Sequence, residues 1–165
     1  MARNGTQFAA TREWRGGSFL ILSGVRVVDK NITSHRDLEI YRRAFEAAMA
    51  VFELTQNLPE KEAYSLVDPM RRASRSVCAN LASAWRRRHF RATCMSKLFK
   101  VQSSAAETQV WIEFAVRCQY FTGEKGRELY ATYKNILKAV DAILNKPEAW
   151  SRRPARAKKP QAPQA

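Results

Sequence analysis

Apolar residues recur at three- and four-residue steps along four stretches of the chain, a spacing typical of amphipathic helices. The first stretch ends at residues 57–59, the third runs from about residue 90 to residue 121, and the fourth ends at Asn145 and Pro147. The expected apolar stripes are, in chain order, Leu38, Tyr41, Phe45, Ala48 and Phe52 with Met49 beside them; Met70, Ala73, Ser74, Val77, Leu81, Ala84 and Trp85; Cys94, Leu98, Val101, Ala105, Thr108 and Ile112; and Leu129, Tyr133, Ile136, Val140 and Ile143. These stripes predict four helices that each turn one face toward a shared core.

The second helix is expected to begin at Asp68, an acceptable N-cap residue, with Pro69 in the first helical position. On a helical projection its arginines lie opposite the apolar stripe, so they do not compete with the core for one face. These arginines are Arg71, Arg72, Arg75 and Arg86.

The C-terminal half of the third helix carries a second apolar stripe on a different face, made of Trp111, Phe114, Cys118 and Phe121. A helix in a monomeric bundle needs one apolar face, so the second stripe calls for a further partner. That partner is either another subunit or the N-terminal extension.

Four amphipathic helices with short connections predict an all-α, antiparallel up-and-down four-helix bundle over residues 35–150. Residues 1–34 are weakly patterned and are expected to form a flexible, poorly ordered extension. The tail, residues 151–165, contains proline, alanine, glutamine and basic residues with nothing to bury, which favours disorder.

The formal net charge of +14 is concentrated in parts of the chain. Residues 151–165 contain five basic residues and no acid, and residues 70–100 contain nine basic residues and no acid. Arginine keeps its charge and matches phosphate geometry, and several arginines on one rigid helix can meet successive phosphates. The sequence therefore predicts a nucleic-acid-binding surface made of Arg71, Arg72, Arg75, Arg86, Arg87, Arg88, Arg91, Lys97 and Lys100.

The alternative interpretation is a solvated face held by salt bridges to first-helix acids such as Glu39, Glu46 or Glu53. Local salt bridges are not expected, because the arginine-bearing stretch offers no obvious acid three or four residues away. Trp85 could stack on a base, but its place in the apolar stripe favours core packing. Asn80 is expected to be a hydrogen-bonded structural residue rather than a base reader.

Other chemistry finds little support in the sequence. The three cysteines are odd in number and form no CxxC pair, which favours buried reduced thiols in a cytoplasmic protein. No catalytic pair, metal-ligand spacing or phosphate-binding loop is present, so no catalytic residue, metal or cofactor is predicted. The apolar run at residues 19–25 is too short to span a bilayer, and no membrane partner is expected.

Several runs resemble a known family: "HRDLEIYRRAFEAAMAVFELTQNLP", "YSLVDPMRRASRSVCANLASAWRRR", "AAETQVWIEFAVRCQYFT" and the closing "NKPEAW". They are similar to the four-helix bundle proteins encoded in 23S rRNA intervening sequences, which include the accessory variability proteins of diversity-generating retroelements. The resemblance covers about residues 35–150. Family members usually begin near residue 32, so residues 1–31 are either an added arm or the product of an upstream start codon.

The resemblance implies a non-enzymatic protein that assembles into a ring, the pentamer being the form associated with the family. In the retroelement branch the ring is basic, binds nucleic acid and associates with a reverse transcriptase. We therefore expect a homo-oligomeric accessory protein that binds RNA or DNA, with a reverse transcriptase as a further partner in the retroelement case. The rival hypothesis is a protein–protein interaction scaffold with no nucleic-acid role.

Overall fold

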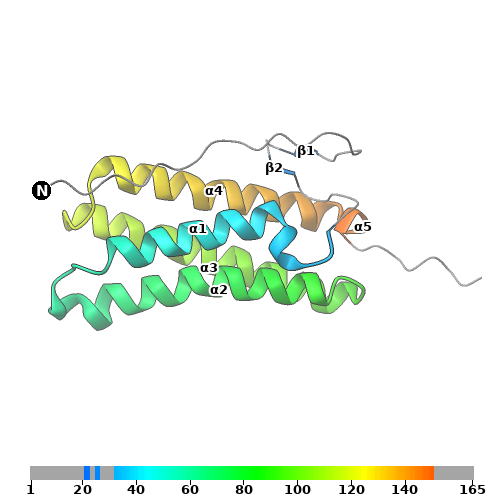
Figure 1. Ribbon diagram of the computed structural model, residues 1–165, viewed down its shortest axis with the longest axis horizontal. Coiled ribbons are helices and arrows are strands. Elements are labelled where there is room, and N and C mark those ends of the chain that lie inside the picture. The colour runs from blue at the N-terminus through cyan, green and yellow to red at the C-terminus, as the bar shows by residue number, and fades with distance from the viewer. Residues whose placement is uncertain (1–20, 23–24, 27–31, 151–165) are drawn as a thin grey trace, which may run out of the picture.

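The chain forms an antiparallel up-and-down bundle of four long helices in a computed structural model that describes residues 21–22, 25–26 and 32–150 (Figure 1). The helices are α1 (Glu39–Leu54), α2 (Asp68–Arg86), α3 (Arg91–Arg117) and α4 (Gly123–Asn145). The predicted fold class is confirmed.

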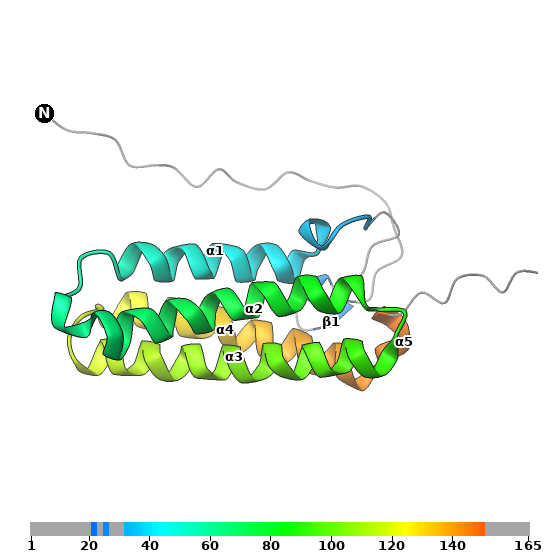
Figure 2. The same cartoon turned by 90° about the horizontal axis from the view of Figure 1, so that it is seen from below.

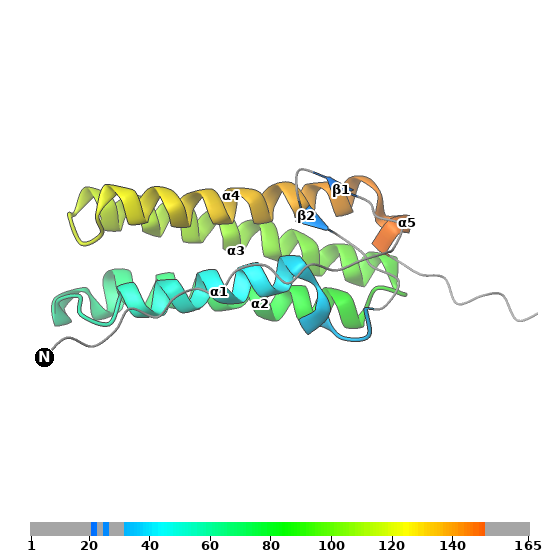
Figure 3. The ribbon, with the colours of Figure 1, turned by 45° about the horizontal axis from the view of Figure 1, so that its top comes forward.

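Each long helix packs against the next one in the chain, and α1 also packs against α4, which closes the bundle. In Figures 2 and 3, α1 and α2 lie along one side of the bundle and α3 and α4 along the other. The pair α2 and α3 shares the most extensive contact. Consequently α1 and α3 lie on a diagonal, and their outer faces point in different directions.

Short elements complete the described chain. Two antiparallel strands, β1 (Ile21–Leu22) and β2 (Val25–Arg26), were not predicted. The 3₁₀ turns η1 (His35–Asp37) and η2 (Glu60–Glu62) flank α1, the π-helical turn η3 (Ala63–Val67) leads into α2, and α5 (Pro147–Trp150) follows α4. The predicted disorder of residues 151–165, and most of the predicted poorly ordered extension, lie outside the described residues.

The start of α2 differs from the prediction. Val67 already has right-handed helical angles and belongs to η3, so Asp68 continues a helical path and does not act as an N-cap. Its carboxylate instead accepts a hydrogen bond from Arg72 at 3.2 Å. Pro69 does lie in the first turn of α2, as predicted.

The expected core stripes of α2, α3 and α4 are all buried. The α1 prediction was confirmed only for Leu38 and Ala48, which are buried. Phe45 is 51% exposed, Met49 is 42% exposed, and Tyr41 and Phe52 are half-buried. The face of α1 that meets the core consists of Ile40, Ala44, Ala47, Ala48 and Val51. Both faces have helical spacing, and the alanine-rich one is buried because small side chains let α1 approach its neighbours closely.

The three cysteines are free thiols, but only Cys78 and Cys94 are buried as predicted. Burial raises the pKa of the Cys78 thiol to about 11 and also raises the pKa of Cys94. Cys118 is exposed, because α3 ends at Arg117 and the chain turns away from the core. The surface of the protein therefore offers one solvent-accessible thiol among the described residues.

We predict that Gly126→Ala destabilises the bundle, because a Cβ at position 126 would overlap the Cγ2 atom of Val116 on α3. Overpacking costs about 1–3 kcal/mol, which exceeds the gain of about 1 kcal/mol from replacing glycine inside a helix. Gly123→Ala is the control, since its Cβ would meet only the flexible guanidinium of Arg127 at 3.2 Å. Urea denaturation should show a lower free energy of unfolding for Gly126→Ala alone, and equal stability of the two variants would contradict the packing argument.

Candidate nucleic-acid interface

The basic residues of α2 and α3 share one side of the bundle because these two helices pack antiparallel in a defined register. The hydroxyls of Ser76 on α2 and Ser104 on α3 are hydrogen-bonded at 2.8 Å. Counting from that pair, Lys100 lies level with Asn80, between Arg75 and Arg86. At 1.5 Å of rise per residue these arginines lie about 8 Å and 9 Å from Lys100 along the helix axis.

Asn80 is a hydrogen-bonded structural residue, as the sequence predicted, and it binds the Ser76 side chain that sets this register. Its side-chain amide donates to the Ser76 carbonyl oxygen at 2.9 Å and to the Ser76 hydroxyl at 3.1 Å. The amide is thereby engaged within α2, which leaves it a poor base reader.

Arg71 is used by the fold, which the sequence did not indicate. Its Nε donates to Thr55 Oγ1 at 2.7 Å, and its Nη2 donates to the Phe52 carbonyl oxygen at 3.4 Å. The guanidinium carbon also lies 4.7 Å from the centre of the Phe52 ring. Arg71 therefore ties the end of α1 to α2 and is half-buried.

Arg72 has a local acidic partner, contrary to the expectation that none was available. The salt bridge to Asp68 spans 3.2 Å, and both side chains are more than half exposed. Exposed pairs of this kind contribute roughly 0–1 kcal/mol, so Arg72 remains available to a stronger anion.

Arg88 closes the end of α2. Its Nη1 donates to the Trp85 carbonyl oxygen at 2.8 Å, and its guanidinium carbon lies 4.0 Å from the centre of the Trp85 ring. Trp85 itself is buried and meets Trp150 of α5 edge-on, with ring centres 5.6 Å apart. Core packing of Trp85 is confirmed, and Arg88 belongs to the structure of the α2 terminus.

The remaining cations form what we call the basic face. Arg75, Arg86, Arg87 and Lys100 are exposed and Lys97 is half-buried, and within the described part of the chain none of these five side chains forms a hydrogen bond or ion pair. Arg91 is exposed at the start of α3 but lies beside Pro147 and Trp150 at the end of the bundle, so the structure does not place this predicted residue on the basic face. Residues 69–106 contain no acid, and Glu46 and Glu53 form no ion pair within the described residues. The salt-bridged alternative therefore finds no support for these five cations.

The four residues of the second apolar stripe of α3 do not all lie on one surface. Phe114 is 53% exposed, Cys118 is exposed and Trp111 is half-buried, with the Trp111 and Phe114 ring centres 6.0 Å apart. Phe121 is buried in the protomer core and is not part of this surface. The reason is the turn after α3, where Gln119 has φ 62° and redirects the chain before Phe121 is reached.

Three exposed apolar features escaped the sequence reasoning. Val110 is 48% exposed and adjoins Phe114 by helical spacing. On α1, Tyr41 stacks on Phe45 with ring centres 6.2 Å apart, and Met49 follows one turn later. At the start of α3, Phe90 is 72% exposed and Phe99 is 52% exposed. The available signal was that Phe90 and Phe99 lie off the core stripe of α3.

Within the ranges that the structure describes, no group of three His, Cys, Asp or Glu side chains is placed to hold a metal ion. Among the same residues, no helix is both long enough and apolar enough to cross a membrane.

Comparisons with known proteins agree with this architecture. A family model described as 23S rRNA-intervening sequence protein matches residues 36–142. The crystal structure of a protein of unknown function from the S23 ribosomal protein family of Bacteroides thetaiotaomicron is similar, with a TM-score of 0.59 and 23% sequence identity. The match covers 65% of this chain and 96% of that one, and it supports the fold alone. No curated protein matches the chain.

We predict that Arg71→Met lowers the free energy of unfolding by about 1–2 kcal/mol, because it removes hydrogen bonds from a charged donor while keeping the apolar stem. Arg75→Met is the matched control on the exposed side of α2, with an expected change within about 0.5 kcal/mol. Thermal and urea denaturation measure both. Equal losses in the two variants would mean that Arg71 does not join α1 to α2.

Proposed function

The chain belongs to the 23S rRNA-intervening sequence protein family, and on that premise we propose that it is a non-enzymatic, oligomeric protein that binds RNA or DNA through its basic face. The observation that carries the proposal is a row of five cations, Arg75, Arg86, Arg87, Lys97 and Lys100, whose side chains form no hydrogen bond or ion pair within the described residues. Each cation that neutralises a phosphate releases condensed counterions, so a row of weak contacts adds to a substantial affinity.

The basic face favours recognition of the phosphate backbone over recognition of sequence. Arginine and lysine dominate it, and the amide of Asn80 is engaged within α2. Contacts to phosphates position a protein on nucleic acid but carry no sequence information. The rival function is a scaffold whose basic face docks an acidic protein. A reverse transcriptase partner follows from the family resemblance alone, since no residue of this chain identifies it.

The proposed assembly rests on apolar side chains that a monomer leaves exposed. Val110 and Phe114 form one apolar face on α3, and Phe45 and Met49 form another on α1. Because α1 and α3 lie on a diagonal, a two-fold dimer through either face would leave the other exposed. Head-to-tail contact of one face with the other covers both, and a rotation between subunits that closes would give a ring such as the pentamer associated with the family.

We predict that Arg75→Gln, Arg86→Gln and Lys100→Gln together weaken binding of the full chain to RNA and DNA. Loss of three phosphate contacts should reduce the slope of log affinity against log salt by about 2–3. Fluorescence anisotropy across a salt series measures this slope.

The control carries three equivalent substitutions at exposed cations away from the basic face: Arg42→Gln, Lys134→Gln and Lys138→Gln. This control has the same net charge as the basic-face triple variant, so it should keep most of the slope of log affinity against log salt. Equal slopes in the two triple variants would assign binding to net charge rather than to the basic face, and absence of binding by the unmodified chain would favour the scaffold.

We predict that Phe114→Glu dissociates the oligomer and speeds the labelling of Cys118, because both residues lie on the proposed interface. Cys78 and Cys94 should react only on unfolding, since they are buried. Tyr64→Glu is the control, as Tyr64 is 91% exposed on η3 and away from both apolar faces. Light scattering measures the mass, and mass spectrometry locates the labelled thiol. A monomer in which Cys118 is protected would assign the α3 face to the N-terminal extension instead.

A further inference from the structure

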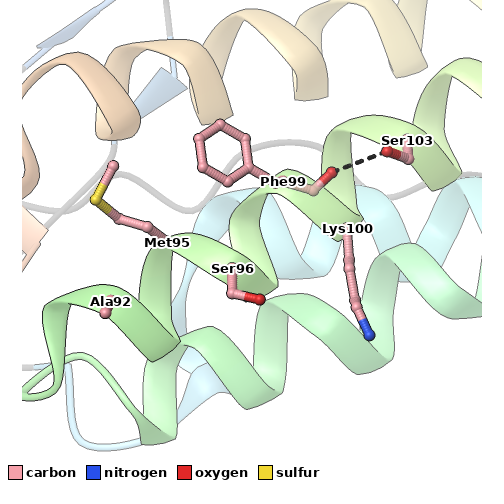
Figure 4. A pocket seen from close by; sticks show the side chains of 6 residues that line it. All are labelled: Ala92, Met95, Ser96, Phe99, Lys100 and Ser103. Carbon is pink, nitrogen blue, oxygen red and sulfur yellow. Dashed lines mark hydrogen bonds between the residues drawn. The ribbon is translucent and has the colours of Figure 1, made fainter.

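An open groove runs along the outer surface of α3 near its N-terminal end. Its volume is about 490 Å³, and it is lined by Ala92, Met95, Ser96, Phe99, Lys100 and Ser103. Figure 4 shows Met95 and Phe99 directed toward α4, whereas Lys100 extends on the other side, toward α2. Small side chains between these walls leave the surface of α3 hollow. The groove therefore has one apolar wall and one cationic wall.

The Phe99 ring gives the apolar wall its chemistry. It is 52% exposed and lies outside the core stripe, so the bundle does not require it for packing. The hydroxyl of Ser103 donates to the Phe99 carbonyl oxygen at 3.2 Å, so this hydroxyl is bound to the backbone of its own helix. A planar ligand can therefore reach the face of the ring from solvent.

The cationic wall continues into the basic face. Through the Ser76–Ser104 register, Lys100 lies between Arg75 and Arg86 along the helix axis. A polyanion that follows these cations passes beside the groove, within reach of Phe99. Residues 69–106 contain no acid, and the Asp141 carboxylate of α4 accepts a hydrogen bond from Gln102 at 2.5 Å on the α4 side of α3.

From this juxtaposition we infer that the α3 groove is a base-stacking subsite for single-stranded nucleic acid, with phosphates on Lys100 and the α2 arginines and an unstacked base on Phe99. This inference rests on the proposed function and specifies its ligand. A duplex keeps its bases stacked inside, where Phe99 does not reach them. Cationic tracks flanked by exposed aromatic rings are the features that bind single strands without sequence preference.

An acidic amphipathic helix is the other polyanionic ligand of comparable size. Such a helix needs a continuous apolar groove that accepts anchors over two or more turns. This groove offers one apolar wall of Met95 and Phe99 opposite a lysine, which suits alternating bases and phosphates better than a continuous apolar stripe.

The experiment uses the full chain and compares a fluorescent 15-nucleotide oligouridylate with a 15-base-pair RNA duplex. Phe99→Ala should weaken binding of the single strand about 5- to 100-fold, leave duplex binding unchanged and leave the salt slope unchanged, because stacking is lost while every phosphate contact remains. Tyr64→Ala removes an exposed ring from η3, away from both apolar faces, and should not affect binding. Phe99→Trp should restore single-strand affinity, and its fluorescence should be quenched on binding.

The outcomes separate this inference from the proposed function. If Phe99→Ala binds the single strand as Tyr64→Ala does, while the basic-face triple variant still loses salt slope, the groove is not a stacking subsite and the proposed function stands. If neither oligonucleotide binds the unmodified chain, both fail. Tight binding of a glutamate-rich amphipathic peptide that depends on Phe99, with unchanged oligouridylate binding, would overturn the inference in favour of a protein ligand.

Discussion

The close packing of α2 on α3 is the contact on which the proposed surface depends. The Ser76–Ser104 hydrogen bond, with Asn80 bound to Ser76, joins the two helices through short side chains. Short side chains at a helix contact let the backbones approach and make a slip of register costly, because tight packing tolerates little change in volume. The same register sets Lys100 among the α2 arginines. A contact made for stability thus also determines where the charges lie.

The arginines of residues 71–88 differ in what their guanidinium groups contact, and Arg72 forms an exposed salt bridge with Asp68. Arg71 and Arg88 donate to oxygens of the protein and lie over aromatic rings, so they act as structural ties. Arg75, Arg86 and Arg87 point into solvent, where water screens their mutual repulsion and keeps its cost small. A bundle of this size could be soluble with fewer such charges. Their concentration without intervening acids is therefore better explained by an anionic partner than by solubility.

The apolar surfaces follow a similar logic. Burial of apolar area contributes about 25 cal/mol per Å², so large side chains left half-exposed on α1 and α3 represent stabilisation that the protomer does not realise. Phe45 and Phe114 lie on diagonal helices, which gives two separate faces. The groove beside Phe99 differs from both, because a lysine forms its second wall. Charge, rather than apolarity, distinguishes the proposed ligand site from the proposed subunit contacts.

The sequence by itself determined the number of helices, their approximate ends and the buried faces of α2, α3 and α4, because helical periodicity relates residues that lie near each other in the chain. It also located the cationic stretch and the core role of Trp85. Only the tertiary structure decided which of two apolar faces of α1 is buried, that Thr55 engages Arg71, and that Phe121 turns inward. Each of these depends on contacts between residues far apart in the chain or on the direction of a turn, and periodicity within one helix contains no information about either.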